Sequence, residues 1–134
     1  MDYKLEVVMI PVTDVDRAKD FYVEKTGFAL DVDFKAENFR VVQLTPPGSA
    51  CSIILSENAE KAGSILGNHM VVEDAVAARD ELAGRGLDIT ETYHFVDGRQ
   101  QPGPDPKRAK YGTFASFADP DGNQWLIQEV PPQS

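Results

Sequence analysis

The 134-residue sequence contains one cysteine, Cys51, so the chain cannot form an internal disulfide. Cys51 lies in an apolar strand pattern, and we interpret it as a small core residue rather than as a nucleophile. No apolar run approaches the ~18 residues that a membrane span requires, and residues 1–4 lack the features of a signal peptide. These absences predict a cytoplasmic protein with no membrane partner.

Basic residues are also scarce, with 13 Lys and Arg against 22 Asp and Glu, which gives a formal net charge of −9. The chain therefore offers no basic face for a phosphate backbone, and we expect no nucleic-acid partner. Acidity of this kind commonly serves solubility, although it would also steer a cationic ligand towards the protein. The hydrophobic fraction of 42% is ordinary, so residues 1–134 are expected to fold as a single domain.

Common catalytic motifs are missing as well. The sequence has no Gly-rich phosphate loop, no serine in a nucleophile-elbow sequence and no cysteine with an obvious histidine partner. Its histidines are His69 and His94, two in all. The neighbouring acids Asp119 and Asp121 are interpreted as turn residues rather than as a catalytic pair.

The most informative stretch that is present lies near the C-terminus, at residues 119–123 (Asp-Pro-Asp-Gly-Asn). Proline presets φ at the second turn position, and glycine accepts the left-handed conformation that follows. The flanks, residues 113–118 and 123–130, are rich in aromatic and β-branched side chains, which predicts a β-hairpin. Its second strand has a core face and a mixed face suited to a cavity wall; these are Trp125 and Ile127 on the first, and Gln124, Leu126 and Gln128 on the second.

Two halves of the chain share one pattern of elements. In the first half, Thr13 and Asp14 provide N-cap chemistry for a helix that Gly27 ends. Its apolar stripe consists of Val15, Ala18, Phe21 and Tyr22. Strands are predicted at residues 5–12, 28–34, 39–44 and 51–56. In the second half a strand at residues 69–73 precedes a helix capped by Asp74 and ended by Gly86, and residues 87–93 are strand-like.

The two halves also match position by position. Five residues have counterparts 60 positions later, four identical and one a lysine replaced by arginine: Val12, Asp14, Ala18, Lys19 and Asp20 correspond to Val72, Asp74, Ala78, Arg79 and Asp80. This repeat predicts two tandem βαβββ modules, residues 1–60 and residues 61–134. The alternative is that any two strand-to-helix joints look alike, because aspartate is a common N-cap.

Residues 94–110 interrupt the second module and are predicted to form a long loop, because they contain two glycines and three prolines. A basic cluster, Arg99, Lys107, Arg108 and Lys110, lies in this segment. Two interpretations remain open: a solvated loop, and a lid that meets an anionic or carbonyl-bearing ligand.

Residues 12–22, Gly27-Phe28 and residues 117–123 together resemble the vicinal oxygen chelate superfamily. This superfamily includes glyoxalase I, bleomycin-resistance proteins, fosfomycin-resistance enzymes and extradiol dioxygenases. The resemblance implies an α+β fold in which two βαβββ modules form a half-open β-barrel around a cavity, and it implies a homodimer. The matching residues are turns, caps and packing positions, so they specify a fold rather than an activity.

Metal-dependent members of the superfamily bind a divalent cation through His and Glu side chains. The resemblance places the corresponding positions at Val7, Ile54, Gly67 and Leu126, and none of these residues can ligate a metal. His69 lies two residues beyond Gly67, which displaces it ~6–7 Å along a strand. We therefore expect a member without the usual metal ligands and without a cofactor, with His69 as a pocket or core histidine. A shifted site from His69, His94 and one carboxylate remains as an alternative.

Three functions follow from these residues. The preferred one is a binding protein that sequesters a small, partly apolar molecule, as drug-resistance relatives do without a metal. Its pocket would be lined by Val7, Met9, Ser52, Ile54, His69, Tyr111, Leu126 and Gln128. The second is a metal-independent lyase, isomerase or hydrolase of a carbonyl compound, with His69 as general base and Lys110 or Tyr111 stabilising an oxyanion. The third is a glyoxalase- or dioxygenase-type metalloenzyme with shifted ligands, so whether the chain is an enzyme stays open.

Overall fold

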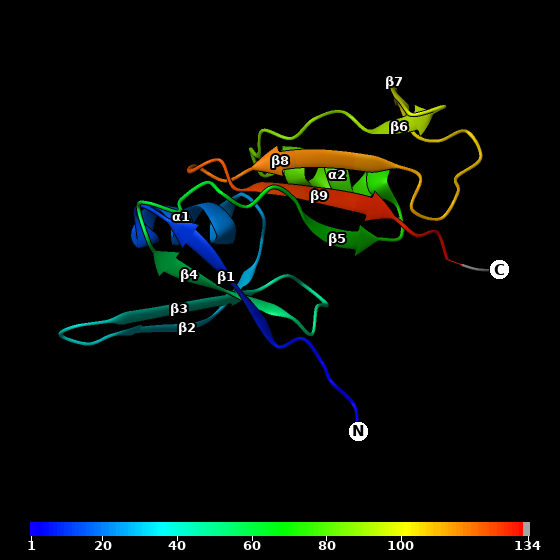
Figure 1. Cartoon of the computed structure of the whole chain (residues 1–134). Helices are drawn as coiled ribbons and strands as arrows, with labels where there is room; N and C mark the ends of the chain where they lie inside the picture. The colour runs from blue at the N-terminus through cyan, green and yellow to red at the C-terminus, as the bar shows by residue number, and fades with distance from the viewer. Residues whose placement is uncertain (133–134) are drawn as a thin grey trace. The chain divides into compact units, whose positions relative to one another are not determined.

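The computed structural model describes residues 1–132, which form two compact units (Figure 1). Unit 1 comprises Met1–Ile65 together with Asp119–Asn123, and unit 2 comprises Leu66–Ala118 and the residues that follow Asn123. Each unit combines one β-sheet with one α-helix, and the sheets are open. The α+β fold that the resemblance implies is therefore confirmed.

Unit 1 contains a four-stranded sheet in the order β1-β4-β3-β2. β1 runs parallel to β4, whereas β3 is antiparallel to both β4 and β2. The elements of this unit are β1 (Val7–Val12), α1 (Val15–Glu24), β2 (Ala29–Lys35), β3 (Arg40–Thr45) and β4 (Ser52–Glu57).

Helix α1 begins and ends where the sequence predicts. Asp14 has an extended backbone and its carboxylate accepts the backbone N–H of Arg17 at 3.1 Å, which satisfies one of the free N–H groups of the first turn. The helix ends before Gly27, whose φ of 74° lies in the left-handed region that favours glycine. Between these ends, Val15, Ala18 and Tyr22 are buried, as the apolar stripe predicts.

The core of unit 1 lies between α1 and one face of its sheet, because α1 packs on β3 and β4. The buried strand residues alternate along the sequence, as side chains of a half-buried sheet do. They are Ile10, Val12, Val42, Leu44, Ile53 and Leu55. We call the opposite face of the sheet, which α1 does not cover, the open face of unit 1.

Unit 2 contains a five-stranded sheet in the order β5-β9-β8-β6-β7, in which β5 and β9 are parallel. Its elements are β5 (Asn68–Val72), α2 (Ala75–Gly84), β6 (Tyr93–Val96), β7 (Arg99–Pro102), β8 (Phe114–Ala118) and β9 (Gln124–Glu129). Helix α2 packs on β8 and β9 (Figure 1). Trp125 and Ile127 are buried on this side, as predicted. The other side is the open face of unit 2.

Helix α2 repeats the capping of α1. The carboxylate of Asp74 accepts the backbone N–H of Ala77 at 3.0 Å. At the other end Gly86, with φ of 89°, donates to the carbonyl of Ala83, and Leu87 donates to the carbonyl of Leu82. This pair of hydrogen bonds is a Schellman motif, so the predicted role of Gly86 is confirmed.

Two predicted segments differ from the structure. Residues 87–93 do not form a strand: Ile89 makes only an isolated bridge to Phe117, and regular pairing starts at Tyr93. The segment predicted as a loop at residues 94–110 begins instead with a hairpin, β6–β7. Asp97 and Gly98 both have positive φ, 52° and 77°, and this conformation matches the twist of a two-residue hairpin turn.

The turn at residues 119–123 belongs to unit 1. The buried carboxylate of Asp119 accepts the phenol of Tyr22 at 2.8 Å and the side-chain amide of Asn123 at 2.8 Å. The same amide donates to the carbonyl of Pro11 at 2.8 Å, and Asp121 accepts the hydroxyl of Thr13 at 2.7 Å. The predicted turn residues thus contact the end of β1 and helix α1 within unit 1.

Candidate functional site

The open face of unit 1 brings together four of the predicted pocket residues. Val7 is paired with Ser52, and Met9 is paired with Ile54, across the parallel strands β1 and β4. Because side chains alternate along each strand, all four point away from α1. Met9 is 54% exposed and Ile54 is half-buried, so an apolar surface is left uncovered on this face.

Aromatic residues extend this apolar surface and were missed by the sequence analysis. Phe34 of β2 and Phe39, which precedes β3, are exposed, and their ring centroids lie 5.7 Å apart. The register pairs Phe34 with Val41, a half-buried residue of the open face. The alternation of residues 28–34 was recognised as a strand signal, but it does not tell which face a helix covers.

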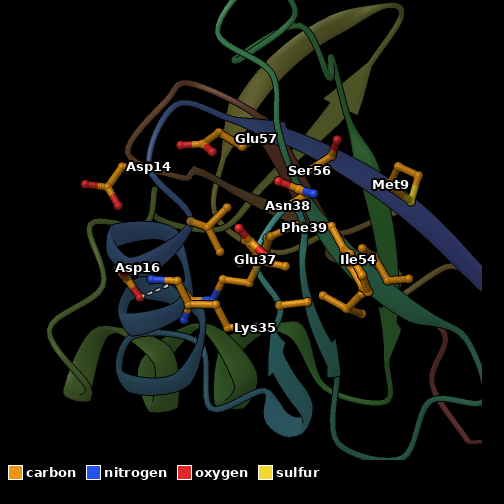
Figure 2. Close-up of a pocket in the computed structure, with 15 residues that line it drawn as sticks. Met9, Asp14, Asp16, Lys35, Glu37, Asn38, Phe39, Ile54, Ser56 and Glu57 are labelled. Atoms are coloured by element: carbon orange, nitrogen blue, oxygen red, sulfur yellow. Dashed lines mark ion pairs between the residues drawn. The ribbon is translucent and has the colours of Figure 1, made fainter.

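A cavity of about 690 Å³ lies in unit 1 beside β3 and β4 (Figure 2). It arises because β3 and β4 pair at only two positions, Gln43 with Ile54 and Leu44 with Ile53. The first residues of β3 therefore diverge from the end of β4, which remains paired with β1 as far as Glu57. The cavity is lined by Met9, Asp14, Val15, Asp16, Lys35, Ala36, Glu37, Asn38, Phe39, Arg40, Val41, Ile54, Leu55, Ser56 and Glu57.

Arg40 in this cavity is neutralised by neighbouring acids. Its guanidinium lies 2.7 Å from the carboxylate of Asp16 and 3.1 Å from that of Asp33, which also contacts Lys19 at 2.8 Å. The hydrogen bonds from Arg40 and then from Lys19 lower the pKa of Asp33 to about 2. The hydrogen bonds to Asp33 and Asp16 raise the pKa of Arg40, so the guanidinium stays charged and ion-paired with these two carboxylates.

The open face of unit 2 carries three further predicted pocket residues. His69 pairs with Leu126, which pairs in turn with Ser116, so these three residues form a row across β5, β9 and β8. Gln128 lies one row further along β9, opposite Phe114. A cavity of about 350 Å³ reaches Ser116 and Leu126 in this unit.

His69 is exposed, so of its two expected roles, a pocket histidine or a core histidine, the second is wrong. The reason is its place on the face that α2 leaves uncovered. Its Nδ1 lies 3.0 Å from the carbonyl oxygen of Gly67. A carbonyl can only accept, which assigns the proton to Nδ1 and leaves Nε2 as the basic nitrogen.

An aromatic cluster on β6 and β8 was also missed. The rings of Tyr93 and Phe114 stack at 5.8 Å, and Phe95 meets Phe114 edge to face at 5.8 Å. The phenol of Tyr93 is hydrogen-bonded to the hydroxyl of Ser116, a residue of the open face. The cluster was not predicted because residues 94–110 were expected to form a loop, although Asp97-Gly98 is a hairpin signal.

The segment between β7 and β8 is tied to the sheet. Arg108 donates its Nε–H to Glu129 at 2.7 Å, so this member of the basic cluster is paired rather than free. Tyr111, with φ of 61°, donates its backbone N–H to the carbonyl of Glu129 at 2.8 Å. The ammonium of Lys110 lies 5.5 Å from the centre of the Tyr111 ring.

The metal-ligand positions of the family do not fit a cation here. Gly67 and Leu126 are adjacent, since a Cβ at position 67 would lie 3.2 Å from Leu126 Cδ1, and Val7 and Ile54 share the open face of unit 1. These side chains contain no nitrogen or oxygen donor. Within residues 1–132, no three His, Cys, Asp or Glu side chains gather in a group that could hold a metal ion. His94 is buried, with its Nδ1 2.8 Å from the carbonyl oxygen of Gly103.

The chain belongs to the Glyoxalase/Bleomycin resistance protein/Dioxygenase superfamily, whose family model matches residues 4–127. Among solved structures, TnmS3, an antibiotic binding protein from Streptomyces sp. CB03234, is 29% identical, with a TM-score of 0.73 and 98% of each chain covered. A glyoxalase/bleomycin resistance protein from the same Streptomyces is 30% identical, with a TM-score of 0.70, over 94% of this chain and 100% of that chain. An uncharacterized protein of Shewanella frigidimarina (strain NCIMB 400) is 34% identical over 127 residues, 92% of this chain and 90% of that protein.

Helices α1 and α2 each comprise 10 residues. Within residues 1–132, no helix has the length and apolar character that a membrane span needs.

Proposed function

We propose that this protein binds a small, partly apolar organic molecule without a metal ion, in a role of sequestration or resistance. The observation that carries the proposal is the uncovered sheet face of each unit, where apolar side chains lie beside a few polar groups. In unit 1 these are Val7, Met9, Val41 and Ile54 with Ser52 and Gln43, and in unit 2 they are Val71, Phe114 and Leu126 with His69 and Gln128. Ligand pockets usually have this composition.

Two further points support the proposal. The positions that correspond by resemblance to the metal ligands of relatives hold valine, isoleucine, glycine and leucine, and none of these side chains offers a nitrogen or oxygen donor. TnmS3, which shares 29% of its residues with this chain, is an antibiotic binding protein. Binding therefore needs only groups that the chain possesses, whereas metal-assisted chemistry needs donors that these four positions lack.

The test is a thermal-unfolding screen with drug-sized apolar compounds. A ligand at one hundred times its Kd stabilises the protein by about 2.7 kcal/mol, because it binds only the folded state. We expect Ile54→Gln to weaken the binding of a compound that occupies the open face of unit 1, and Leu126→Gln to weaken the binding of one that occupies the open face of unit 2. Leu66→Gln serves as control, because Leu66 is 80% exposed and lies outside the strands. A screen without hits, or a stoichiometric transition metal in protein purified without added metal, would contradict the proposal.

A second candidate function, a metal-independent enzyme acting on a carbonyl compound, is favoured by one observation. The hydrogen bond of His69 to Gly67 leaves Nε2 as a basic nitrogen on an exposed ring, which is what a general base requires. Lys110 and Tyr111 remain its candidate oxyanion partners. If His69→Gln abolishes turnover of a carbonyl substrate and leaves its affinity intact, this function replaces the first.

A further inference from the structure

We propose that the cavity between β3 and β4 of unit 1 selects an organic cation, an amine attached to an apolar body. The inference rests on the proposed function and adds the chemical class of the ligand. A volume of about 690 Å³ lies within the range of about 300–1,000 Å³ that is usual for drug-sized ligands.

The apolar part of the lining comes from the strands. Met9, Val41 and Ile54 contribute side chains from the open face, and Phe39 contributes an exposed ring beside them. Figure 2 shows Met9 and Ile54 on the strands and Phe39 in the turn that connects β2 to β3. A hydrocarbon or aromatic body placed against these groups removes their exposed surface from water.

The charged part of the lining has an excess of acid. Four carboxylates, from Asp14, Asp16, Glu37 and Glu57, stand against the cations of Lys35 and Arg40. Asp16 and Arg40 are ion-paired at 2.7 Å, and Asp14 accepts the backbone N–H of Arg17, the hydrogen bond that caps α1. These contacts stabilise the protein itself and leave the remaining carboxylates to a ligand.

Glu37 and Glu57 are those remaining carboxylates. Both are exposed, and within residues 1–132 neither takes part in a salt bridge. Lys35 is the one further cation in the lining, so the unpaired groups still carry net negative charge. A ligand ammonium beside these glutamates gains attraction from both, and the protein's net charge of −9 steers it in the same direction. An anionic ligand would meet repulsion instead.

The test uses three probes with the same phenylpropyl body: 3-phenylpropylamine, 3-phenylpropan-1-ol and 3-phenylpropionate. Binding is followed by NMR on protein labelled with ¹³C at the methionine methyl groups, which gives three signals. Met9 lines the cavity, whereas Met70 belongs to β5 of unit 2 and Met1 is fully exposed at the N-terminus. We expect the amine to shift the Met9 signal with an affinity about tenfold above that of the alcohol, because only the amine can form ion pairs with Glu37 and Glu57.

Matched variants identify the source of the selectivity. Glu37→Gln with Glu57→Gln should lower the affinity for the amine to that of the alcohol, while the affinity for the alcohol stays the same. Glu60→Gln is the control, since Glu60 is exposed and outside the cavity lining. Raising the salt concentration should lower the affinity for the amine and leave the affinity for the alcohol unchanged.

Several outcomes overturn the inference. If the Met9 signal gives equal affinities for the amine and the alcohol, the selectivity is refuted. The same holds if the double variant binds the amine as tightly as the wild type does. Either result leaves the proposed function standing. If the amine shifts the Met70 signal but not the Met9 signal, or if millimolar amine does not shift the Met9 signal, the cavity is not the binding site. The thermal screen with apolar compounds decides separately whether the protein binds small molecules at all.

Discussion

Glu129→Gln tests a buried carboxylate on which the end of unit 2 depends. The side chain of Glu129 is fully buried at the end of β9. It accepts Nε–H of Arg108 at 2.7 Å and a second N–H of the same guanidinium, and it accepts the backbone N–H of Ala75, the first residue of α2, at 3.0 Å. One carboxylate thus joins β9, the segment after β7 and the start of a helix.

The magnitude follows from what glutamine keeps and loses. Removing one member of a buried ion pair costs about 3–5 kcal/mol. The side chain of Arg108 is 45% exposed, so its guanidinium can turn to water, and the glutamine oxygen can still accept the N–H of Ala75. The glutamine NH₂, however, would face an arginine N–H, with two donors and no acceptor. We therefore expect a loss of about 3 kcal/mol at neutral pH, which lowers Tm by about 10 °C for a chain of this size.

The pH dependence distinguishes this mechanism from simple mispacking. The hydrogen bonds from Arg108, and secondarily the N–H of Ala75, lower the pKa of Glu129 in the folded protein below its ordinary value of 4.5. A lowered folded pKa means that the stabilisation is complete above the unfolded pKa and is lost as the pH falls through the folded pKa. The difference in the free energy of unfolding between wild type and Glu129→Gln should therefore shrink steadily below about pH 4.5.

Urea unfolding between neutral pH and pH 3 measures this difference. Trp125 is the sole tryptophan of the chain and lies in β9, so its fluorescence reports on unit 2. Glu91→Gln is the matched control, because the side chain of Glu91 is 83% exposed and its ion pair with Arg79 should contribute no more than about 0.5 kcal/mol. A difference that stays constant down to pH 3, or a Glu129→Gln protein as stable as wild type at pH 7, would refute the reasoning.

Three further substitutions test the turn at residues 119–123 and its surroundings, with denaturant midpoints as the measurement. Tyr22→Phe removes one hydrogen bond to a carboxylate, that of Asp119, which keeps other donors, so we expect a loss of about 1–2 kcal/mol. Asn123→Ala removes three side-chain hydrogen bonds and should cost about 3 kcal/mol. Gly63→Ala forces a Cβ against a backbone carbonyl of this turn. It should lower the free energy of unfolding more than Gly98→Ala, because position 98 has open space for a Cβ and its φ of 77° is similar to the 80° of Gly63. Equal losses of stability would contradict the steric argument.

The parts of the fold that the sequence predicted correctly depend on local chemistry. Asp14 and Asp74 cap helices because an aspartate oxygen reaches an N–H three residues away, and the hydrogen bonds from Arg17 and Ala77 have this spacing. Gly27 and Gly86 adopt positive φ for the same local reason. Such signals depend only on residues that lie close together in the chain, so they can be recognised in the sequence. The fold class and the family could therefore be inferred from them.

The cavity of unit 1 could not be predicted in this way. Alternation identifies each strand, but it does not determine where the pairing of two strands stops. β3 and β4 separate after two paired positions, and only the register shows that Glu37 and Glu57 come to line one cavity with Met9. The β6–β7 hairpin was a different kind of error. Asp97-Gly98 is a local sequence signal for a hairpin turn, but the prolines and glycines around it favoured a loop.

The metal positions show how geometry and chemistry separate within a family. Position 67 lies against Leu126, close enough that a Cβ there would touch it. The resemblance assigns both positions to the metal ligands of relatives, and the sequence alone shows that neither residue has a donor side chain. What occupies the face in their place depends on neighbours in the sheet rather than in the chain: Ser116 beside Leu126, and Phe114 beside Gln128. Such cross-strand neighbours decide which ligand a face accepts, because a family pattern fixes the positions of side chains but leaves their chemistry free to change.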